Sequence, residues 1–265
     1  MISPQPRGDS SDGEGGGGAG LPRRSGRVLP GALALDARLS RAPAHDEVGF
    51  VIAHQTHELW LEQFSCELAV LVTDLDADCL PAARRTLERA ERIVAVLIEQ
   101  LRALDALPLA ELRGLDSLLG RDSGLGSDPL CRLGQLAGNG AATLQRWLAR
   151  ERRPDRPRSV SVREAFIRAV ARRLPGGGYP DAPSLASPDV PRERQLGRWL
   201  ASCLSQPPLA AQRELALRLR DLDEQLATWG RQRHALRRRL CLAGSRGPRG
   251  SEPALDRRFF PELWT

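Results

Sequence analysis

The sequence predicts an all-α protein: a single-domain helical bundle that follows a disordered N-terminal tail. Three observations lead to this prediction. From Leu29 onward, apolar residues recur with the period of amphipathic helices, strand-like alternation of β-branched residues is essentially missing, and proline and glycine clusters separate the helical stretches. The chain has 265 residues, 41% of them hydrophobic, which is enough for one substantial core.

The elements follow from the N-terminus in order. Residues 1–26 are mainly Gly, Ser, Pro and charged residues, including GEGGGGAG, and they cannot bury enough apolar surface to fold. We therefore predict a disordered tail at 1–26 and one all-α domain at 27–265. Helices are expected at 32–41, 46–76, 81–106, 109–119, 128–152, 160–173, 191–204 and 208–242. The longest break between them is LPGGGYPDAPSLASPDVP, residues 174–191.

The last of these helices is long and carries a clear apolar seam for the core. The seam consists of Leu215, Leu219, Leu222, Leu226, Trp229, Leu236 and Leu240. The chain closes with FFPELW, Phe259 to Trp264. Several exposed aromatic side chains are unfavourable, so this tail is expected to dock on the bundle.

The charge pattern favours solvated helix faces over a nucleic-acid-binding surface. The net charge is +6, and all 39 basic residues are arginine. The arginines alternate with acids, as in LERAERI and LRLRDLDEQL, a pattern typical of i,i+4 ion pairs on exposed faces. We therefore expect no nucleic-acid partner, with an arginine-rich nucleic-acid binder as the alternative.

Several features indicate a cytoplasmic protein. The chain has no run of about 20 apolar residues, so no membrane span is expected. The N-terminus lacks the basic start and apolar core of a secretory signal. The five cysteines are scattered without a CxxC motif, which is typical of reduced thiols.

Three of the four histidines lie in one stretch, HDEVGFVIAHQTHELW, residues 45–60. Helical spacing places Phe50, His54 and Leu61 on one stripe, with His57 and Glu58 beside it. A metal site, a hydrogen-bonded core histidine and a catalytic base are all consistent with His54. HQTHE does not match the HExxH zinc motif, and His57, off the stripe, is expected to be structural or exposed.

The fourth histidine, His234, lies in RQRHALRRR near the end of the long helix. It lies off the leucine seam by roughly a quarter turn, and the small residues Gly230 and Ala227 precede it by one and two turns. These residues leave a shallow notch in which a flat group would fit. Nearby arginines would be able to pair with ligand carboxylates: Arg231, Arg233, Arg237, Arg238 and Arg239. A basic surface run with an incidental histidine is the alternative.

Together, these stretches resemble the tryptophan 2,3-dioxygenase family of haem enzymes. The most specific block is HDEVGFVIAHQTHELWLEQFSCEL (45–68), which resembles HDE-x2-F-x3-HQ-x2-ELW-x2-Q-x3-EL. The other blocks follow in the family's order: LALDARL (33–39), LLGRDSGLGS (118–127), RQRHALRRRLCLAGSRGPRG (231–250) and the closing FFPELW.

The resemblance implies the all-α fold of haem-dependent dioxygenases, a homotetramer, and one haem b per subunit with O₂ as co-substrate. It also implies tryptophan catabolism by the kynurenine pathway, in which both oxygen atoms add across the indole C2–C3 bond of L-tryptophan, or of a close indole relative, to give N-formylkynurenine. His234 corresponds to the proximal iron ligand, and Ser127 to the haem-binding set. His54 corresponds to the distal catalytic histidine that contacts the indole nitrogen, and Phe50 to the aromatic residue that packs on the indole.

The chain departs from the family pattern at the contacts that hold the amino-acid part of the substrate. Leu29 and Ala32 stand where the family has tyrosines, and Pro248 stands where it has a threonine. Arg113 is the candidate for the arginine that binds the substrate carboxylate. Its distance to the following Leu-Gly pair is three residues too long, and the ungapped alignment places Asp116 there instead.

These departures leave two further functions open. One is a related histidine-ligated haem monooxygenase or hydroxylase that acts on an aromatic substrate in secondary metabolism. The other is a helical haem-binding or interaction protein without catalytic activity.

Overall fold

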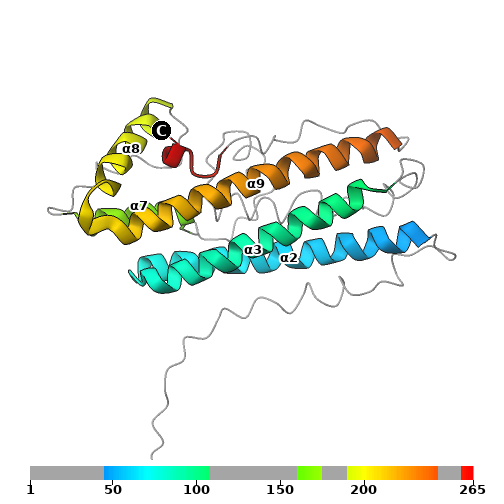
Figure 1. The fold of residues 1–265 in the computed structure, drawn as a ribbon, viewed down its shortest axis with the longest axis horizontal. Coiled ribbons are helices and arrows are strands. Elements are labelled where there is room, and N and C mark those ends of the chain that lie inside the picture. The colour runs from blue at the N-terminus through cyan, green and yellow to red at the C-terminus, as the bar shows by residue number, and fades with distance from the viewer. Residues whose placement is uncertain (1–44, 108–159, 175–189, 244–257, 265) are drawn as a thin grey trace, which may run out of the picture. The chain divides into compact units, whose positions relative to one another are not determined.

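The computed structural model describes residues 45–107, 160–174, 190–243 and 258–264. Contacts divide the chain into Met1–Ala34 and Leu35–Thr265, and every described residue lies in the second unit. Its helices are α2 (His45–Asp76), α3 (Leu80–Asp105), α7 (Val162–Ala171), α8 (Val190–Leu204) and α9 (Ala210–Ala243), with short 3₁₀ helices η2 (Pro207–Leu209) and η3 (Pro261–Trp264) (Figure 1). The described residues are almost wholly helical and contain no strand, which confirms the all-α prediction.

The expected helices at 46–76, 81–106, 160–173, 191–204 and 208–242 agree closely with α2, α3, α7, α8 and α9. The expected helices at 32–41, 109–119 and 128–152 lie outside the described residues, as do the tail at 1–26 and most of the break at 174–191. The described helices contain no segment that is both long and apolar enough to cross a membrane.

Helices α2 and α3 form an antiparallel pair. Arg89 on α3 binds Glu67 on α2, with 2.8 Å between Nη2 and Oε2. One turn earlier on α3, Thr86 donates to Asp74, farther along α2, at 2.8 Å. The partner residues therefore run in opposite directions along the two helices.

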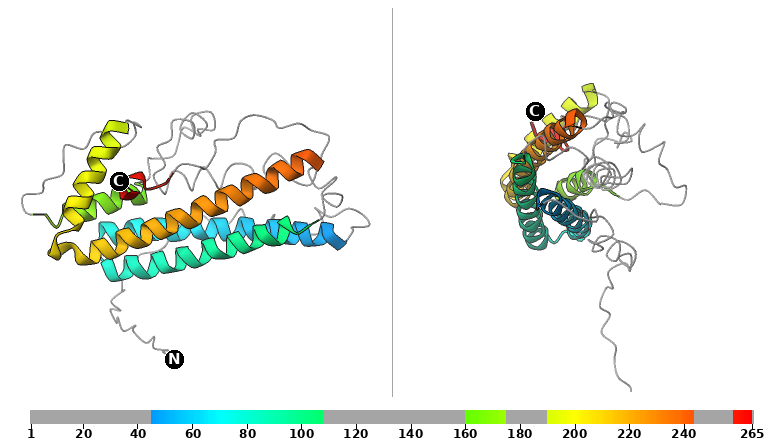
Figure 2. Two further views of the ribbon diagram at one scale, coloured as in Figure 1. Left: turned by 45° about the horizontal axis from the view of Figure 1, so that its top comes forward. Right: turned by 90° about the vertical axis from the view of Figure 1, so that its right-hand side faces the viewer.

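Helices α3 and α9 run parallel. Arg84 binds Glu214 at 2.9 Å, and farther along both helices Arg218 binds Glu91 at 2.9 Å. Because α3 is antiparallel to α2 and parallel to α9, α2 and α9 are antiparallel. Figures 1 and 2 show the three long helices side by side, with α7, α8 and η3 at the end where α9 begins.

The core lies between these helices. Every residue of the predicted α9 seam is buried: Leu215, Leu219, Leu222, Leu226, Trp229, Leu236 and Leu240. They pack in one cluster with the apolar faces of α2, α3 and α7. The seam prediction is confirmed because a period of 3.6 residues places these side chains on one face of the helix.

Arginine pairs both within and between helices. Arg84 and Glu88 form the i,i+4 contact that the sequence predicts, at 3.2 Å. Other pairs, such as Arg168 with Asp76 at 2.9 Å, join different helices. Among the described cysteines, Cys66, Cys79 and Cys203 form no disulfide.

The short helix α7 begins with a capping box. The Ser161 side chain accepts from the Glu164 backbone N–H, and the Glu164 carboxylate accepts from the Ser161 backbone N–H. This reciprocal pair satisfies two backbone donors that the first helical turn would leave exposed. The same turn carries Arg163, which forms a buried ion pair with Glu262 of η3 at 2.9 Å.

The C-terminal tail docks on α9, as the sequence predicts. Phe259 and Phe260 are buried, and their backbone N–H groups donate to the buried carboxylate of Asp223 at 2.8 and 3.4 Å. The indole Nε1 of Trp264 donates to the same carboxylate at 2.9 Å. The guanidinium of Arg258 covers the Trp264 ring at 3.8 Å.

Candidate functional site

Phe50 and His54 lie next to each other on the buried face of α2. They are one turn apart, and their side chains are 1% and 5% exposed. The ring centroids are 6.2 Å apart, with 51° between the ring planes. Leu61, on the same stripe, is also buried. The prediction that these three side chains share one stripe of the helix is confirmed, and the structure shows that this stripe is buried.

The imidazole of His54 is held beside an acidic residue. Its Nδ1 lies 3.3 Å from Oε1 of Glu58, one turn later on α2. A carboxylate at this distance favours a proton on Nδ1, so in the neutral ring the buried Nε2 carries the lone pair. In that form Nε2 accepts a hydrogen bond or takes up a proton.

His57 is buried rather than exposed, so the exposed alternative of the sequence analysis is wrong and the structural one is confirmed. Its side chain is 2% exposed. Nε2 accepts from the indole Nε1 of Trp229 on α9 at 3.2 Å. This assigns the ring proton to Nδ1, which donates to Oε1 of Gln100 on α3 at 3.2 Å. The helix period alone does not show that α3 and α9 meet at this side chain.

The environment of His57 keeps the ring neutral. Burial lowers its pKa from 6.5 to about 4, and the charges of His54 and Arg233 act in the same direction, while the hydrogen bond to Gln100 acts against them. Both ring nitrogens are used in hydrogen bonds, so His57 has no lone pair left for a metal. Within the described ranges, no group of three or more His, Cys, Asp or Glu side chains lies together as a metal site.

The hydrogen bonds continue from His57 back to α2. The side-chain amide of Gln100 donates to Oγ1 of Thr56 at 3.0 Å. Thr56 in turn donates to the backbone carbonyls of Ile52 and Ala53, at 2.9 and 3.0 Å. This series of hydrogen bonds therefore begins at Trp229 on α9, passes through His57 on α2 and Gln100 on α3, and ends on the α2 backbone.

Gln55, which follows His54 in the chain, has a buried polar side chain. Its side chain is 5% exposed, and its amide Nε2 has no hydrogen-bond partner among the residues that the structure describes. A buried donor in this state costs about 1–3 kcal/mol. An acceptor on a bound molecule would remove that cost.

His234 lies on α9, five residues after Trp229, and its side chain is exposed. The prediction that it lies off the leucine seam is confirmed. The neighbouring Arg233 is buried, as are Gly230 and Ala227, the small residues of the expected notch. The imidazole of His234 therefore remains outside the packed core.

The two site helices bring His54 and His234 toward the same end of the bundle. Because α2 and α9 are antiparallel, going back from His57 to His54 and forward from Trp229 to His234 leads in the same direction. At 1.5 Å per residue, the displacements along the helices are about 4–5 Å and 7–8 Å.

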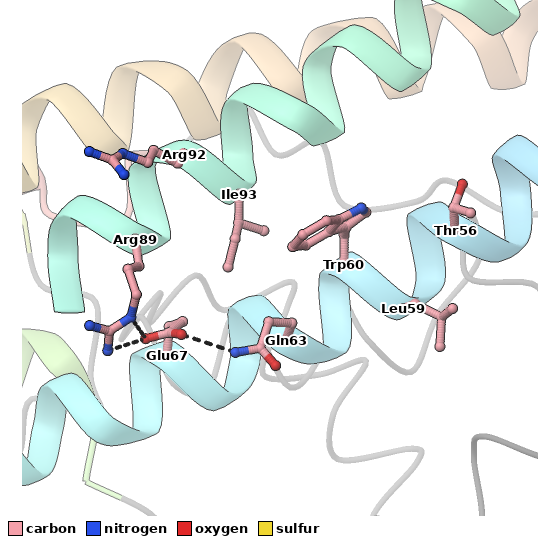
Figure 3. Close-up of a pocket in the computed structure, with 8 residues that line it drawn as sticks. All are labelled: Thr56, Leu59, Trp60, Gln63, Glu67, Arg89, Arg92 and Ile93. Atoms are coloured by element: carbon pink, nitrogen blue, oxygen red, sulfur yellow. Dashed lines mark hydrogen bonds and ion pairs between the residues drawn. The ribbon is translucent and has the colours of Figure 1, made fainter.

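A different hollow, of about 650 Å³, opens on the outer side of α2 and α3 (Figure 3). Trp60 is its partly exposed aromatic residue, and the Arg89–Glu67 ion pair lies at one end. The lining is Thr56, Leu59, Trp60, Gln63, Glu67, Arg89, Arg92 and Ile93. Of the predicted site residues that the structure describes, Phe50, His54 and His234, none lines it, so it is separate from the Phe50–His54 face.

Some residues of the site were not singled out by the sequence. Glu58 has a usable signal, since it lies four residues after His54 on the same helix. Gln100 and the indole N–H of Trp229 have none, because their partners are 43 and 172 residues away from them. The predicted positions Arg113, Asp116 and Ser127 lie outside the described residues, as do Leu29, Ala32 and Pro248.

The fold and these side chains define a class: all-α proteins in which a buried histidine of one long helix, His54, and an exposed histidine of an antiparallel helix, His234, lie toward the same end of a helical core. Comparisons with known proteins specify the family. The tryptophan 2,3-dioxygenase family model matches residues 30–150. The tryptophan 2,3-dioxygenase of Burkholderia pseudomallei is 30% identical over 247 residues, covering 87% of this chain and 79% of that protein. The enzyme of the same name from Burkholderia ambifaria is 30% identical over 244 residues, covering 87% and 78%. The chain belongs to the tryptophan 2,3-dioxygenase family.

Proposed function

We propose that this protein is a haem-dependent oxygenase that dioxygenates L-tryptophan, or a close indole relative, at the indole C2–C3 bond to give N-formylkynurenine. Within the structure, the observation that carries the proposal is the buried pair of Phe50 and His54, with the basic atom of the imidazole turned away from Glu58. Membership of the family supplies the reaction class.

The side chains present fit a haem b group. His234 offers an exposed imidazole, and neutral imidazole is a common axial ligand of haem iron. His57 does not compete for the iron, because both of its nitrogens are engaged. The buried amide of Gln55 has no partner among the described residues and offers a donor for a bound molecule. We assign His234 as the iron ligand and Ser127 to the haem-binding set.

The chemistry that haem supplies when bound is the activation of O₂, which no amino-acid side chain provides. The protein's own residues bind and orient the substrate. Nε2 of His54 accepts a hydrogen bond from the indole N–H, and the Phe50 ring packs on the indole. Burial of both side chains excludes water from this wall of the site.

The amino-acid part of the substrate has fewer contacts here than in the family pattern. We assign the substrate carboxylate to Arg113, through a charge-assisted hydrogen bond worth about 1.5–3 kcal/mol. Pro248 has neither a hydroxyl nor an N–H group for the substrate ammonium, and Leu29 and Ala32 have no hydroxyl. Affinity for free tryptophan is therefore expected to be lower, by ten- to hundredfold for one lost contact of this strength.

We also propose a homo-oligomer, a tetramer by family, that works in the cytoplasm. Light scattering of the haem-loaded protein measures the assembly directly. A particle with the mass of four chains would support the tetramer, and a monomer at micromolar concentration would contradict it.

The test of the function uses purified protein loaded with haem, together with His234→Ala and a control, Leu217→Ala, which changes an exposed residue of the same helix. We expect the Soret band to be lost or shifted in His234→Ala and unchanged in the control. After anaerobic titration with tryptophan and indole analogues, O₂ is added and the product mass is measured. A gain of two oxygen atoms supports dioxygenation. A gain of one oxygen atom supports the hydroxylase instead, and haem binding without turnover of any indole indicates a non-catalytic protein.

A further inference from the structure

We propose that His57 is a positioning residue of this site: as the Nδ1-protonated neutral tautomer, it ties Trp229 on α9 to Gln100 on α3 and so holds the His234 helix in place against the His54 helix. This inference rests on the proposed function for its effect on turnover. The hydrogen bonds on which it stands are observed independently.

The donor and the acceptor of each of these hydrogen bonds are fixed by the chemistry of the side chains. Trp229 has only an N–H and can only donate, so Nε2 of His57 must accept. The proton then lies on Nδ1, and Gln100 must turn its carbonyl toward His57 and its amide toward Thr56. In the other tautomer, two N–H groups would face each other at 3.2 Å. The same arrangement is lost when His57 gains a second proton.

The hydrogen bond between His57 and Trp229 joins the two helices that carry His54 and His234. Helices α2 and α9 each pack extensively on α3 and approach each other closely at few positions. The contact between His57 and Trp229 is one of these positions, and both side chains are buried. The two rings lie almost parallel, with 19° between their planes and 6.0 Å between their centroids.

The hydrogen bond between His57 and Trp229 lies close to both candidate site histidines along their helices. His54 lies one turn from His57 on α2, and His234 lies less than two turns from Trp229 on α9. Both helices are rigid over such short distances, so a shift at the tie is passed on to both histidines. A misplacement of about 1 Å between catalytic groups can reduce turnover about a hundredfold.

The experiment compares three single variants and one double variant in the full-length, haem-loaded protein. His57→Leu removes both hydrogen bonds but still fills the buried space, with an apolar side chain. Trp229→Phe keeps an aromatic ring and removes only the N–H. His57→Gln restores one acceptor for Trp229 and one donor for Gln100, and it is the conservative control. The double variant His57→Leu/Trp229→Phe tests whether the two residues act as one unit.

Turnover of tryptophan is measured per bound haem. We expect a ten- to hundredfold loss in His57→Leu and in Trp229→Phe, no further loss in the double variant, and recovery to within about threefold of the native rate in His57→Gln. The proposal is overturned if His57→Leu retains native turnover, or if His57→Gln is as impaired as His57→Leu.

Two measurements without haem separate this proposal from the proposed function. ¹⁵N NMR of the histidine rings reports which nitrogen of His57 carries the proton, and we expect Nδ1. Amide hydrogen exchange is expected to rise in both α2 and α9 in His57→Leu and to remain native in His57→Gln. If the native protein oxidises no indole, the proposed function fails, and the NMR and exchange results alone decide the role of His57. A proton on Nε2, or unchanged exchange in His57→Leu, contradicts it.

Discussion

The indole N–H of Trp229 donates to Nε2 of His57, 3.2 Å away, across the buried contact between α9 and α2. Since the indole can only donate, this contact requires an unprotonated ring nitrogen. The last long helix of the domain is therefore joined to the helix of His54 by an imidazole that must stay neutral. This requirement leads directly to a pH dependence.

The first prediction is that His57 makes the protein less stable in acid. Because its pKa falls from 6.5 to about 4 on folding, the unfolded chain binds more protons between these values. Stability is therefore fully present above pH 6.5 and is lost as the pH falls toward 4. At about 1.4 kcal/mol per tenfold change in proton affinity, the loss is on the order of 3 kcal/mol.

The measurement is the free energy of unfolding in urea across this pH range, compared with His57→Gln, which does not titrate there. We expect the variant to show a shallower pH dependence by this amount. The nearby groups that also carry charge, His54, Glu58 and Arg233, are present in both proteins, so the difference isolates His57. Equal slopes for the two proteins would show that His57 titrates normally.

The second prediction concerns Glu58, whose carboxylate lies 3.3 Å from Nδ1 of His54. The carboxylate beside Nδ1 favours one tautomer and one orientation of the His54 ring. We expect Glu58→Ala to lower kcat/KM for tryptophan by about tenfold, the equivalent of one contact of about 1.4 kcal/mol. Glu58→Gln, which keeps an oxygen beside Nδ1, is expected to lose less. Glu99→Gln, on an exposed side chain of α3, serves as the control, and native kcat/KM in Glu58→Ala would rule out a role for this carboxylate.

The third prediction is that Gln55 improves binding at the expense of stability. Its buried amide has no partner among the described residues, so Gln55→Leu is expected to raise the free energy of unfolding of the apoprotein by about 1 kcal/mol. The same change is expected to weaken the binding of haem or tryptophan, because it removes a buried donor that a bound molecule would be able to use. Urea unfolding of the apoprotein and spectral titration of the loaded protein measure the two effects. A variant that is less stable as apoprotein would contradict the prediction.

The fourth prediction concerns Asp223, which holds the C-terminal tail. Burial raises the pKa of this carboxyl, while the hydrogen bonds from the tail and the charge of Arg258 act against the shift. A raised pKa means that the folded state binds more protons, so this contribution to stability is present in acid and declines as the pH rises through the folded-state pKa.

Asp223→Asn mimics the protonated carboxyl and does not titrate. We expect the melting temperature of the native protein, relative to this variant, to decline as the pH rises from about 3.8, the ordinary value for Asp. Asp221→Asn, an exposed position on the same helix, is the control. A difference that grows with pH would have the wrong sign.

The fifth prediction concerns the buried ion pair between Arg163 on α7 and Glu262 in the tail, 2.9 Å apart. Removing one partner leaves a buried charge unpaired, so Arg163→Met is expected to cost about 3–5 kcal/mol. Replacing both, as Arg163→Met/Glu262→Leu, is expected to recover most of that loss. Urea unfolding of the three proteins tests this, and equal losses in the single and double variants would contradict it.

The sequence by itself determined the helices and the faces of α2 and α9. Helix formation depends on a period of 3.6 residues and on proline and glycine at the breaks, and both are local properties. The same period placed Phe50 beside His54 and assembled the buried seam from Leu215 to Leu240. The family motifs are contiguous stretches of the chain, so the sequence alone is enough to identify them.

Only the tertiary structure decided what surrounds each histidine. His57 is buried because α3 and α9 meet there, and its hydrogen-bond partners, Gln100 and Trp229, are 43 and 172 residues away in the chain. Packing between distant helices has no period along the sequence, so His57 could be described only as structural or exposed. Its tautomer, its low pKa and its tie to the helix of His234 all follow from a contact that exists only in the folded protein.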